Sequence, residues 1–278
     1  MLMIFLASMI VESLKKIKSI FIKDMQMAKS YKFSFIAQYL FLFGQILLFY
    51  LISLYFDRTL TEFANLNYFL FILTGICVFD FGSSIINYGP RELLTMKQSG
   101  ILEEIIQLNI SKFIFFMGIN VYQIFVSIIR FIIFLLIIRV FFDGTINIFE
   151  VTVLTISLLI FVFSCIFIGI IGSAFTLIFY KANIFTTIFI FLTILFSNVY
   201  YPSEIILDGA LEPFSQILSF TPMIEIFRDI ISNDYNLDYS YINLIHLICL
   251  TLLYGVTSYY VLSFAIKKSK KNGIFLFY

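Results

Sequence analysis

The sequence contains few charged residues, one histidine, three cysteines and no tryptophan. Charged residues make up 13% of the chain and hydrophobic residues 61%, whereas soluble domains contain roughly 25% and 45–50%. This composition does not fit a soluble domain and is typical of a membrane protein. Cys77, Cys165 and Cys249 lie in apolar segments with no close pair, which argues against a disulfide or a cysteine metal site.

Motifs for common catalytic and nucleotide sites are also absent. GxxxxGK followed by Ser or Thr does not occur, so the chain does not bind nucleotide through a P-loop; HExxH and GxSxG do not occur either. His246, alone in an apolar segment, is more typical of hydrogen-bonded packing than of a proton relay. The sequence therefore predicts no enzyme active site and no metal site in this chain.

Six strongly apolar segments are present instead. They cover residues 33–56, 68–89, 113–142, 149–180, 184–201 and 242–266. Each is near or above the ~20 residues that cross a bilayer core as a helix. Backbone amides in hydrocarbon must bond within their own segment, which favours helices. The prediction is an all-α integral membrane protein, with residues 1–278 as one membrane domain and a six-span bundle over 33–266.

Lysine and arginine are distributed unevenly between the loops. Fourteen of them fall in residues 1–32, in the loops at 90–112 and 181, and in the tail at 267–278, while the opposite loops hold only Arg58 and Arg228. An excess of positive charge marks the cytoplasmic side. The pattern predicts a multi-pass protein of the cell (inner or plasma) membrane with both termini in the cytoplasm.

The segment before the first span is amphipathic. Leu14, Ile17, Phe21, Met25 and Ala28 recur at helical spacing, and lysines occupy most other positions. A helix in the membrane surface, with its lysines towards anionic headgroups, fits this pattern. The alternative is a basic flank that only fixes the orientation.

Two loops have helical character of their own. The cytoplasmic loop at 90–112 alternates leucine and isoleucine with charge, and Gly100 divides it into two short helices. The external loop at 202–241 is apolar enough to dip back into the membrane as a re-entrant helical hairpin. Pro213 and Pro222 are predicted to begin its two short helices, with Thr221 as an N-cap.

Two ionisable residues lie deep in the predicted spans. Asp80 and Arg130 are both about 12 residues from the external ends of their spans, a depth of ~18 Å. Charge at that depth is costly and usually faces a partner or a wet cavity. We expect the two side chains to pair; the alternative is that one of them lines a substrate path.

Local sequence matches indicate a family. Residues 97–105, K-Q-S-G-I-L-E-E-I, are similar to the R-x-x-G-T-L-E-x-L segment that follows the second span in permease subunits of ABC-2 type transporters. Tyr201-Pro202, Thr221-Pro222 and Arg228 resemble that family's short external helices between spans five and six. The resemblance extends over nearly the whole chain.

The resemblance implies a permease subunit of an ABC exporter. Such permeases work as homodimers or heterodimers with two separate ATPase subunits, which bind ATP and Mg²⁺ and drive alternating access. Membrane lipids are further partners, and nucleic acid is not. The coupling contacts implied are Arg91, Lys97, Leu102, Glu103, Glu104 and Ile105, of which Leu102 and Ile105 would pack into an ATPase groove. The alternative is an amphipathic connector that rests on the headgroups.

Differences between this sequence and the family's motifs reduce the range of expected substrates. The Leu-Gly-x-x-Trp signature of capsule and O-antigen exporters is missing, which favours a drug, natural product or lipid over a lipid-linked glycan. A lipid-modifying membrane enzyme is an alternative because the loop at 202–241 is rich in acids. Those acids are Glu204, Asp208, Glu212, Glu225 and Asp229. A secondary transporter is a further alternative, although no inverted repeat is visible.

Overall fold

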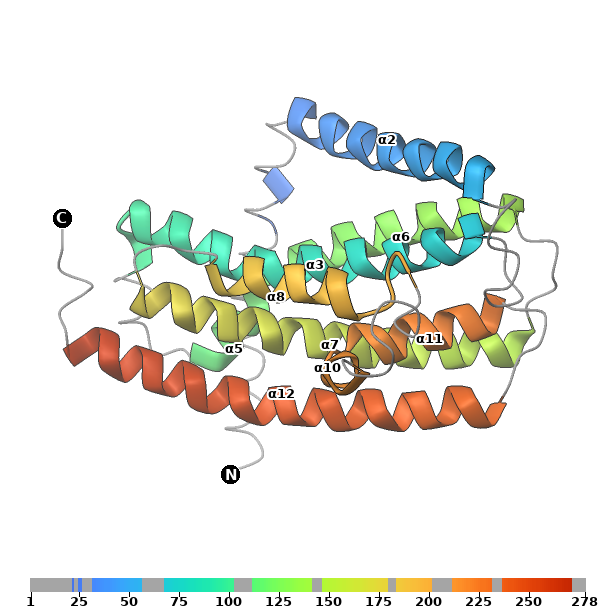
Figure 1. Cartoon of the computed structure of the whole chain (residues 1–278). Coiled ribbons are helices and arrows are strands. Elements are labelled where there is room, and N and C mark those ends of the chain that lie inside the picture. Colours follow the sequence, from blue (N-terminus) through green and yellow to red (C-terminus); the bar gives the residue numbers. More distant parts are fainter. Residues whose placement is uncertain are drawn as a thin grey trace, which may run out of the picture.

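All regular structure in the described part of the chain is helical (Figure 1). The computed structural model describes residues 22, 25–26, 32–56, 68–102, 112–141, 147–179, 184–201, 212–231 and 237–271. Its helices are α2 (Lys32–Phe56), α3 (Tyr68–Gln98), α5 (Lys112–Ile119), α6 (Val121–Phe141), α7 (Ile148–Ile178), α8 (Ile184–Phe196), α10 (Glu212–Ile217), α11 (Phe220–Ile231) and α12 (Leu237–Lys271). Most of the segment at 12–32, including the predicted surface helix, lies outside these residues.

Within the described residues, five helical segments are long and apolar enough to cross a membrane. They are Ile36–Leu54 in α2, Tyr68–Gln98, Phe115–Val140 across α5 and α6, Ile148–Ile178, and Leu237–Ser269 in α12. This finding confirms the prediction of an all-helical chain and fits a multi-pass membrane protein.

The fifth of the six predicted spans is not confirmed. Only its first 13 residues, Ile184–Phe196, form the helix α8, and bends follow at 197–201. A helix of that length rises only about 20 Å, less than a ~30 Å hydrocarbon core. Asn198 has φ 55°, a left-handed conformation that commonly ends helices. Because the segment is apolar throughout, its composition does not show that the helix ends at this point.

The second span is longer than predicted. The sequence places a boundary at Pro90, yet α3 continues through this proline to Gln98. Pro90 is buried, and the position of a methyl carbon on Gly172 of α7 would lie 3.1 Å from its Cγ, so the ring packs closely against that helix. Tertiary packing therefore overrides the local preference of proline. The helix does end near Gly100, which has φ +74° as the predicted break requires.

The third span is broken near its start. Asn120 forms a turn between α5 and α6, and its side-chain amide donates to the carbonyl of Phe116 at 3.1 Å. Phe113 on α5 lies near the rings of Phe167 and Tyr259, at centroid distances of 6.3 and 6.1 Å. α5 therefore packs towards α7 and α12, whereas α6 packs against α3.

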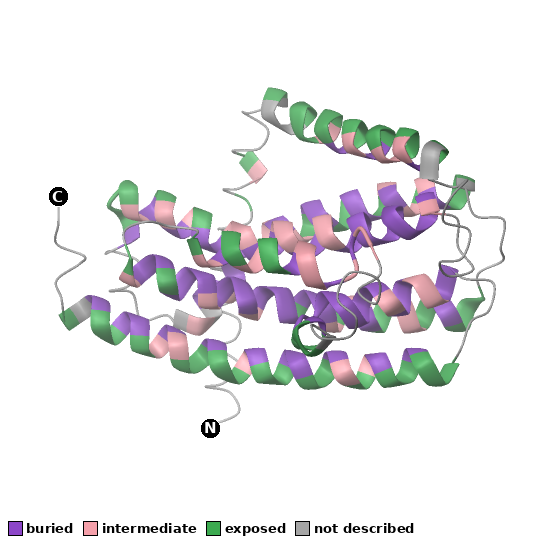
Figure 2. Ribbon diagram, in the orientation of Figure 1, coloured by how far each residue is buried: buried purple, intermediate pink, exposed green. Residues whose placement is uncertain are grey.

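The core of the bundle lies between α3 and α7. Buried side chains are concentrated on these two helices and on α11, while α2 and the outer side of α12 are exposed (Figure 2). Gly169 of α7 allows close approach to α3, because a methyl carbon there would lie 3.2 Å from the carbonyl oxygen of Ile86. On α2, Leu42, Ile46 and Ser53 are the buried residues among the described side chains. α2 is thus the most loosely attached helix of the bundle.

The two short helices α10 and α11 lie between α8 and α12 in the chain. α11 packs against α3, α7 and α12. Phe220 at its start contacts Phe161 of α7, with ring centroids 5.0 Å apart. Thr221 is not an N-cap as predicted: α11 begins one residue earlier, and the Thr221 hydroxyl donates to the carbonyl of Ser215 at 2.8 Å.

Candidate functional site

An ion pair joins α3 and α6 in the interior of the bundle. Arg130 Nη1 donates to Asp80 Oδ1 at 3.1 Å. The side chain of Arg130 is 4% exposed and that of Asp80 is 27% exposed. The sequence predicts this pair from the equal depth of the two residues, and the structure contains it. Opposite charges so close together reduce the cost of placing each one in a region of low dielectric.

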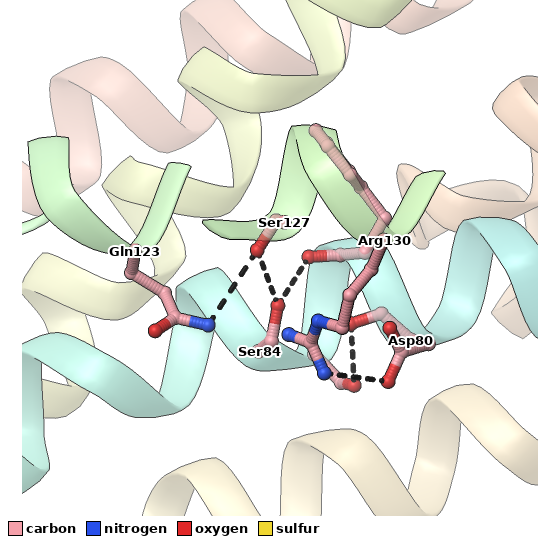
Figure 3. A network of polar contacts seen from close by, with 7 residues as sticks. Asp80, Ser84, Gln123, Ser127 and Arg130 are labelled. Carbon is pink, nitrogen blue, oxygen red and sulfur yellow. Dashed lines mark hydrogen bonds and ion pairs between the residues drawn. The ribbon is translucent and has the colours of Figure 1, made fainter. Parts of the chain in front are cut away.

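Neutral polar side chains continue the network along the same two helices (Figure 3). The hydroxyls of Ser84 and Ser127 are 2.7 Å apart, and Gln123 Nε2 donates to Ser127 Oγ at 3.5 Å. Sequence reasoning missed these residues, although their spacing contains the signal. Ser84 lies four residues after Asp80, and Gln123 and Ser127 lie seven and three residues before Arg130, so each set shares one helix face.

Three polar atoms of the charged pair have no hydrogen-bond partner among the described residues. They are Asp80 Oδ2, Arg130 Nε and Arg130 Nη2. Tyr39 on α2 is within electrostatic reach of both charges. The charged pair therefore retains two donor atoms and one acceptor atom without partners, which makes it the candidate binding site of this chain.

Arg228 on α11 has a different environment. Its Nη2 donates to three backbone carbonyls, those of Phe71 at 3.0 Å, Asn198 at 2.6 Å and Val199 at 3.4 Å. Its Nε donates to Thr74 Oγ1 at 3.4 Å. The guanidinium carbon also lies 3.5 Å from the centroid of the Phe71 ring. Arg228 therefore fastens α11 to the start of α3 and to the bends after α8.

The charge of Arg228 is retained at neutral pH. Burial lowers the pKa of Arg228 from 12.5 to about 9, and the nearby carboxylate of Glu225 opposes this shift. A pKa of about 9 leaves the guanidinium protonated at pH 7. The carbonyl oxygens around it provide the electron density that stabilises the cation.

Glu225 and Asp229 connect α11 to α12. The Tyr239 hydroxyl donates to Glu225 Oε2 at 2.9 Å, and the Ser240 hydroxyl donates to Asp229 Oδ2. Burial raises the pKa of Glu225, while the hydrogen bond from Tyr239 and the charge of Arg228 hold it down. In addition, the Tyr254 hydroxyl donates to the carbonyl of Ile217 at the end of α10. The hairpin is thus bound on both sides by polar contacts.

The residues predicted to contact an ATPase are only partly described. Arg91 is exposed and Lys97 is half-buried near the end of α3. Leu102 is 2% exposed and belongs to the core of this chain, so it does not present its side chain outward. Glu103, Glu104 and Ile105 lie outside the described residues.

The prolines of the predicted hairpin occupy different environments. Pro213 is exposed in α10, and Pro222 is buried in α11. Pro202 lies outside the described residues. Among the residues that the structure describes, no group of three or more His, Cys, Asp or Glu could hold a metal ion.

Comparisons with known proteins do not assign a family. No protein-family model matches the sequence, and no curated protein matches it significantly. The functional argument therefore depends on the residues and geometry described above.

Proposed function

We propose that this chain is the membrane-spanning permease subunit of an ATP-driven ABC exporter of the ABC-2 type. In this proposal it moves an amphipathic drug, natural product or lipid out of the cytoplasm or the inner leaflet by alternating access. The energy comes from two ATPase subunits that bind ATP and Mg²⁺. The permease acts as a homodimer or heterodimer in the cell membrane, with both termini in the cytoplasm.

The hairpin before the last helix is the observation that carries this proposal. α10 and α11 lie between α8 and α12, and α11 is packed into the bundle against α3, α7 and α12. The resemblance to ABC-2 permeases implies two short external helices at this place in the chain. Arg228, one of the residues that carry the resemblance, holds α11 to α3 through the carbonyl of Phe71.

The order of contacts along α11 also supports a re-entrant hairpin. Phe220, at its start, lies against Gly82 in the middle of α3, whereas Arg228 reaches Phe71 near the beginning of α3. The chain after α8 therefore returns to the middle of the bundle before it runs towards the end where α12 begins. In this proposal α8 and α11 together complete a sixth passage, which places both termini on one side.

The opposite end of α3 supports a coupling region. α3 extends two turns past Pro90, and a new helical segment begins after Gly100 at Ile101, whose side chain is 48% exposed. The acidic pair Glu103 and Glu104 follows directly. We propose Arg91, Lys97, Glu103, Glu104 and Ile105 as the coupling contacts. Leu102 is left out because its side chain is buried within this chain.

Charge reversal tests the coupling region. Glu103→Lys combined with Glu104→Lys should abolish permease-dependent ATP hydrolysis by the assembled complex in lipid nanodiscs. The matched control is Asp238→Lys at the other end of the bundle, an exposed acid in the first turn of α12; it should leave ATP hydrolysis unchanged. Full ATP hydrolysis by the double variant would contradict the coupling role of Glu103 and Glu104.

One observation favours a second candidate, a secondary transporter. The Asp80–Arg130 pair lies inside the bundle with a partly exposed carboxylate, and intramembrane ionisable groups often mark ion or proton pathways. This candidate requires transport driven by an ion gradient in proteoliposomes that contain no ATPase. The permease proposal requires ATP and the partner subunit.

A further inference from the structure

The guanidinium groups of Arg130 and Arg228 differ in how far their hydrogen bonds are satisfied. Arg228 is surrounded by backbone carbonyls, whereas Arg130 uses only Nη1, on Asp80. Nε and Nη2 of Arg130 and Oδ2 of Asp80 have no partner among the described residues. Buried polar atoms are nearly always paired because leaving them unpaired is unfavourable. The free edge of this pair therefore points to a ligand.

The geometry of the free atoms defines what that ligand offers. Nε and Nη2 of one guanidinium form a rigid two-donor fork that matches an oxygen acceptor. Asp80 Oδ2 next to it is an acceptor and needs a donor. The side chain of Asp80 is 27% exposed, but the three unpaired atoms are themselves buried, so a ligand reaches them only when neighbouring side chains move aside. Tyr39 on α2 is within electrostatic reach of both charges, and α2 packs against α3.

Charge balance restricts the ligand further. Asp80 and Arg130 together are neutral. An anion at the fork would be repelled by Asp80, a cation at Oδ2 would be repelled by Arg130, and either would bring net charge into a region of low dielectric. A neutral group with adjacent acceptor and donor satisfies all three atoms without that cost. An amide is such a group, with its carbonyl at the fork and its N–H at Oδ2.

We propose that the free edge of Arg130 and Oδ2 of Asp80 form a binding subsite for the backbone amide of an uncharged, apolar peptide or peptide-like natural product. Calling this ligand a substrate rests on the proposed transport function. The subsite itself depends only on the geometry of the pair. Ser84, Gln123 and Ser127 hold the facing surfaces of α3 and α6 in register beside it.

Equilibrium binding to the full-length chain in lipid nanodiscs tests this subsite. The probe is radiolabelled N-acetyl-trileucine methylamide. Its comparison compound is the depsipeptide in which esters replace the amides, which keeps every carbonyl and loses the N–H donors. Empty nanodiscs correct for partitioning into lipid. The wild-type protein should bind the amide saturably and at least about tenfold more tightly than the ester.

Two variants separate the subsite from general packing. Arg130→Lys keeps a cation beside Asp80 but removes the fork, and should weaken amide binding about tenfold or more. Arg139→Lys makes the same change at an exposed arginine later in α6 and should change binding less than about twofold. If Arg130→Lys does not fold, the comparison of amide and ester on the wild-type protein still decides the question.

Several results would overturn the subsite. They are absence of saturable amide binding, equal affinity for amide and ester, and wild-type affinity in folded Arg130→Lys. Saturable displacement of the amide by a short-chain zwitterionic phospholipid, at lower concentration than by unlabelled amide, would assign the pair to a lipid headgroup instead. No ATPase is present in these experiments. A negative binding result therefore does not contradict the proposed function, and failure to find an ATPase partner does not change the binding result.

Discussion

At the scale of single residues, the pair of Asp80 and Arg130 is costly for the fold. Arg130 is 4% exposed, and removing such a charge from water costs several kcal/mol. One hydrogen bond at 3.1 Å offsets only part of that cost, and three polar atoms stay unpaired in the described chain. A pair of apolar side chains would stabilise the bundle as well or better. The pair is therefore better explained by a role in binding than by a role in stability.

Single and double neutralising variants test whether the two charges depend on each other. Arg130→Gln leaves Asp80 without its partner and should lower the free energy of unfolding by about 3 kcal/mol. Asp80→Asn should have a similar effect. The double variant should recover most of the loss, because it buries no unpaired charge. Thermal unfolding in a mild detergent measures all three.

Ser84→Ala serves as the reference for these changes in the free energy of unfolding. It removes a neutral hydrogen bond in the same network, which should cost about 1 kcal/mol. If the double variant loses as much free energy of unfolding as the two single variants together, the charges do not interact and the ion pair does not contribute to stability.

A pH dependence is expected from Glu225. Because burial raises its pKa above the ordinary 4.5, the folded protein holds this proton more tightly than the unfolded chain. The corresponding stability is fully present below pH 4.5 and is lost as the pH rises through the raised pKa. Glu225→Gln cannot lose a proton, so its melting temperature relative to wild type should increase from pH 4.5 to neutral pH.

Tyr239→Phe is the control for the Glu225 measurement. Tyr239 donates a hydrogen bond to the Glu225 carboxylate, which favours the charged form. Without this bond the pKa of Glu225 should rise further, and stability should fall more steeply with pH. A difference between Glu225→Gln and wild type that does not change with pH would contradict this assignment.

At the scale of elements, close backbone contact fixes the end of α8 against α3. A methyl carbon on Gly75 would overlap the carbonyl oxygen of Val199, one of the carbonyls that also binds Arg228. Gly75→Ala should therefore displace the bends at 197–201 and destabilise the protein by about 2 kcal/mol. Hydrogen exchange of α11 should increase, because Arg228 loses part of its anchor.

Gly44→Ala is the matched control on α2. Apart from its own stretch of helix, no described part of the chain comes within 4 Å of a methyl carbon placed there, and alanine favours helix more than glycine by up to about 1 kcal/mol. This variant should be as stable as wild type or slightly more stable. Equal behaviour of Gly44→Ala and Gly75→Ala would show that the contact with Val199 is not required.

The sequence predicts most helices and misplaces several of their ends for identifiable reasons. The starts of α2, α3 and α7 lie within a residue or two of the apolar boundaries, since hydrophobic length alone determines them. The passage of α3 through Pro90 depends on its contact with Gly172, which no local pattern contains. The early end of α8 depends on the left-handed Asn198, and Asn in a Ser-Asn pair is only a weak stop signal.

At the scale of the whole molecule, depth in the membrane predicts the contact of Asp80 with Arg130, whereas no pattern in the sequence predicts the contacts of Arg228. Equal depth on consecutive spans brings Asp80 to Arg130. The sequence predicts only that Arg228 lies in the hairpin. Its carbonyl partners belong to α3 and to the bends after α8, which are distant from Arg228 in the sequence. Such a site forms only when the hairpin packs into the bundle, and therefore it could not be derived from spacing.

The proposed function depends most on one point, that an ATPase on another chain drives transport by this chain. The most direct measurement is purification of the full-length protein from its native membranes in a mild detergent, with quantitative mass spectrometry of the co-purified subunits. If the proposed function is correct, a P-loop ATPase co-purifies in the same molar amount as this chain. The preparation then hydrolyses ATP, and vanadate inhibits the hydrolysis. A folded, monodisperse preparation with no P-loop subunit and no ATP hydrolysis would contradict the proposed function.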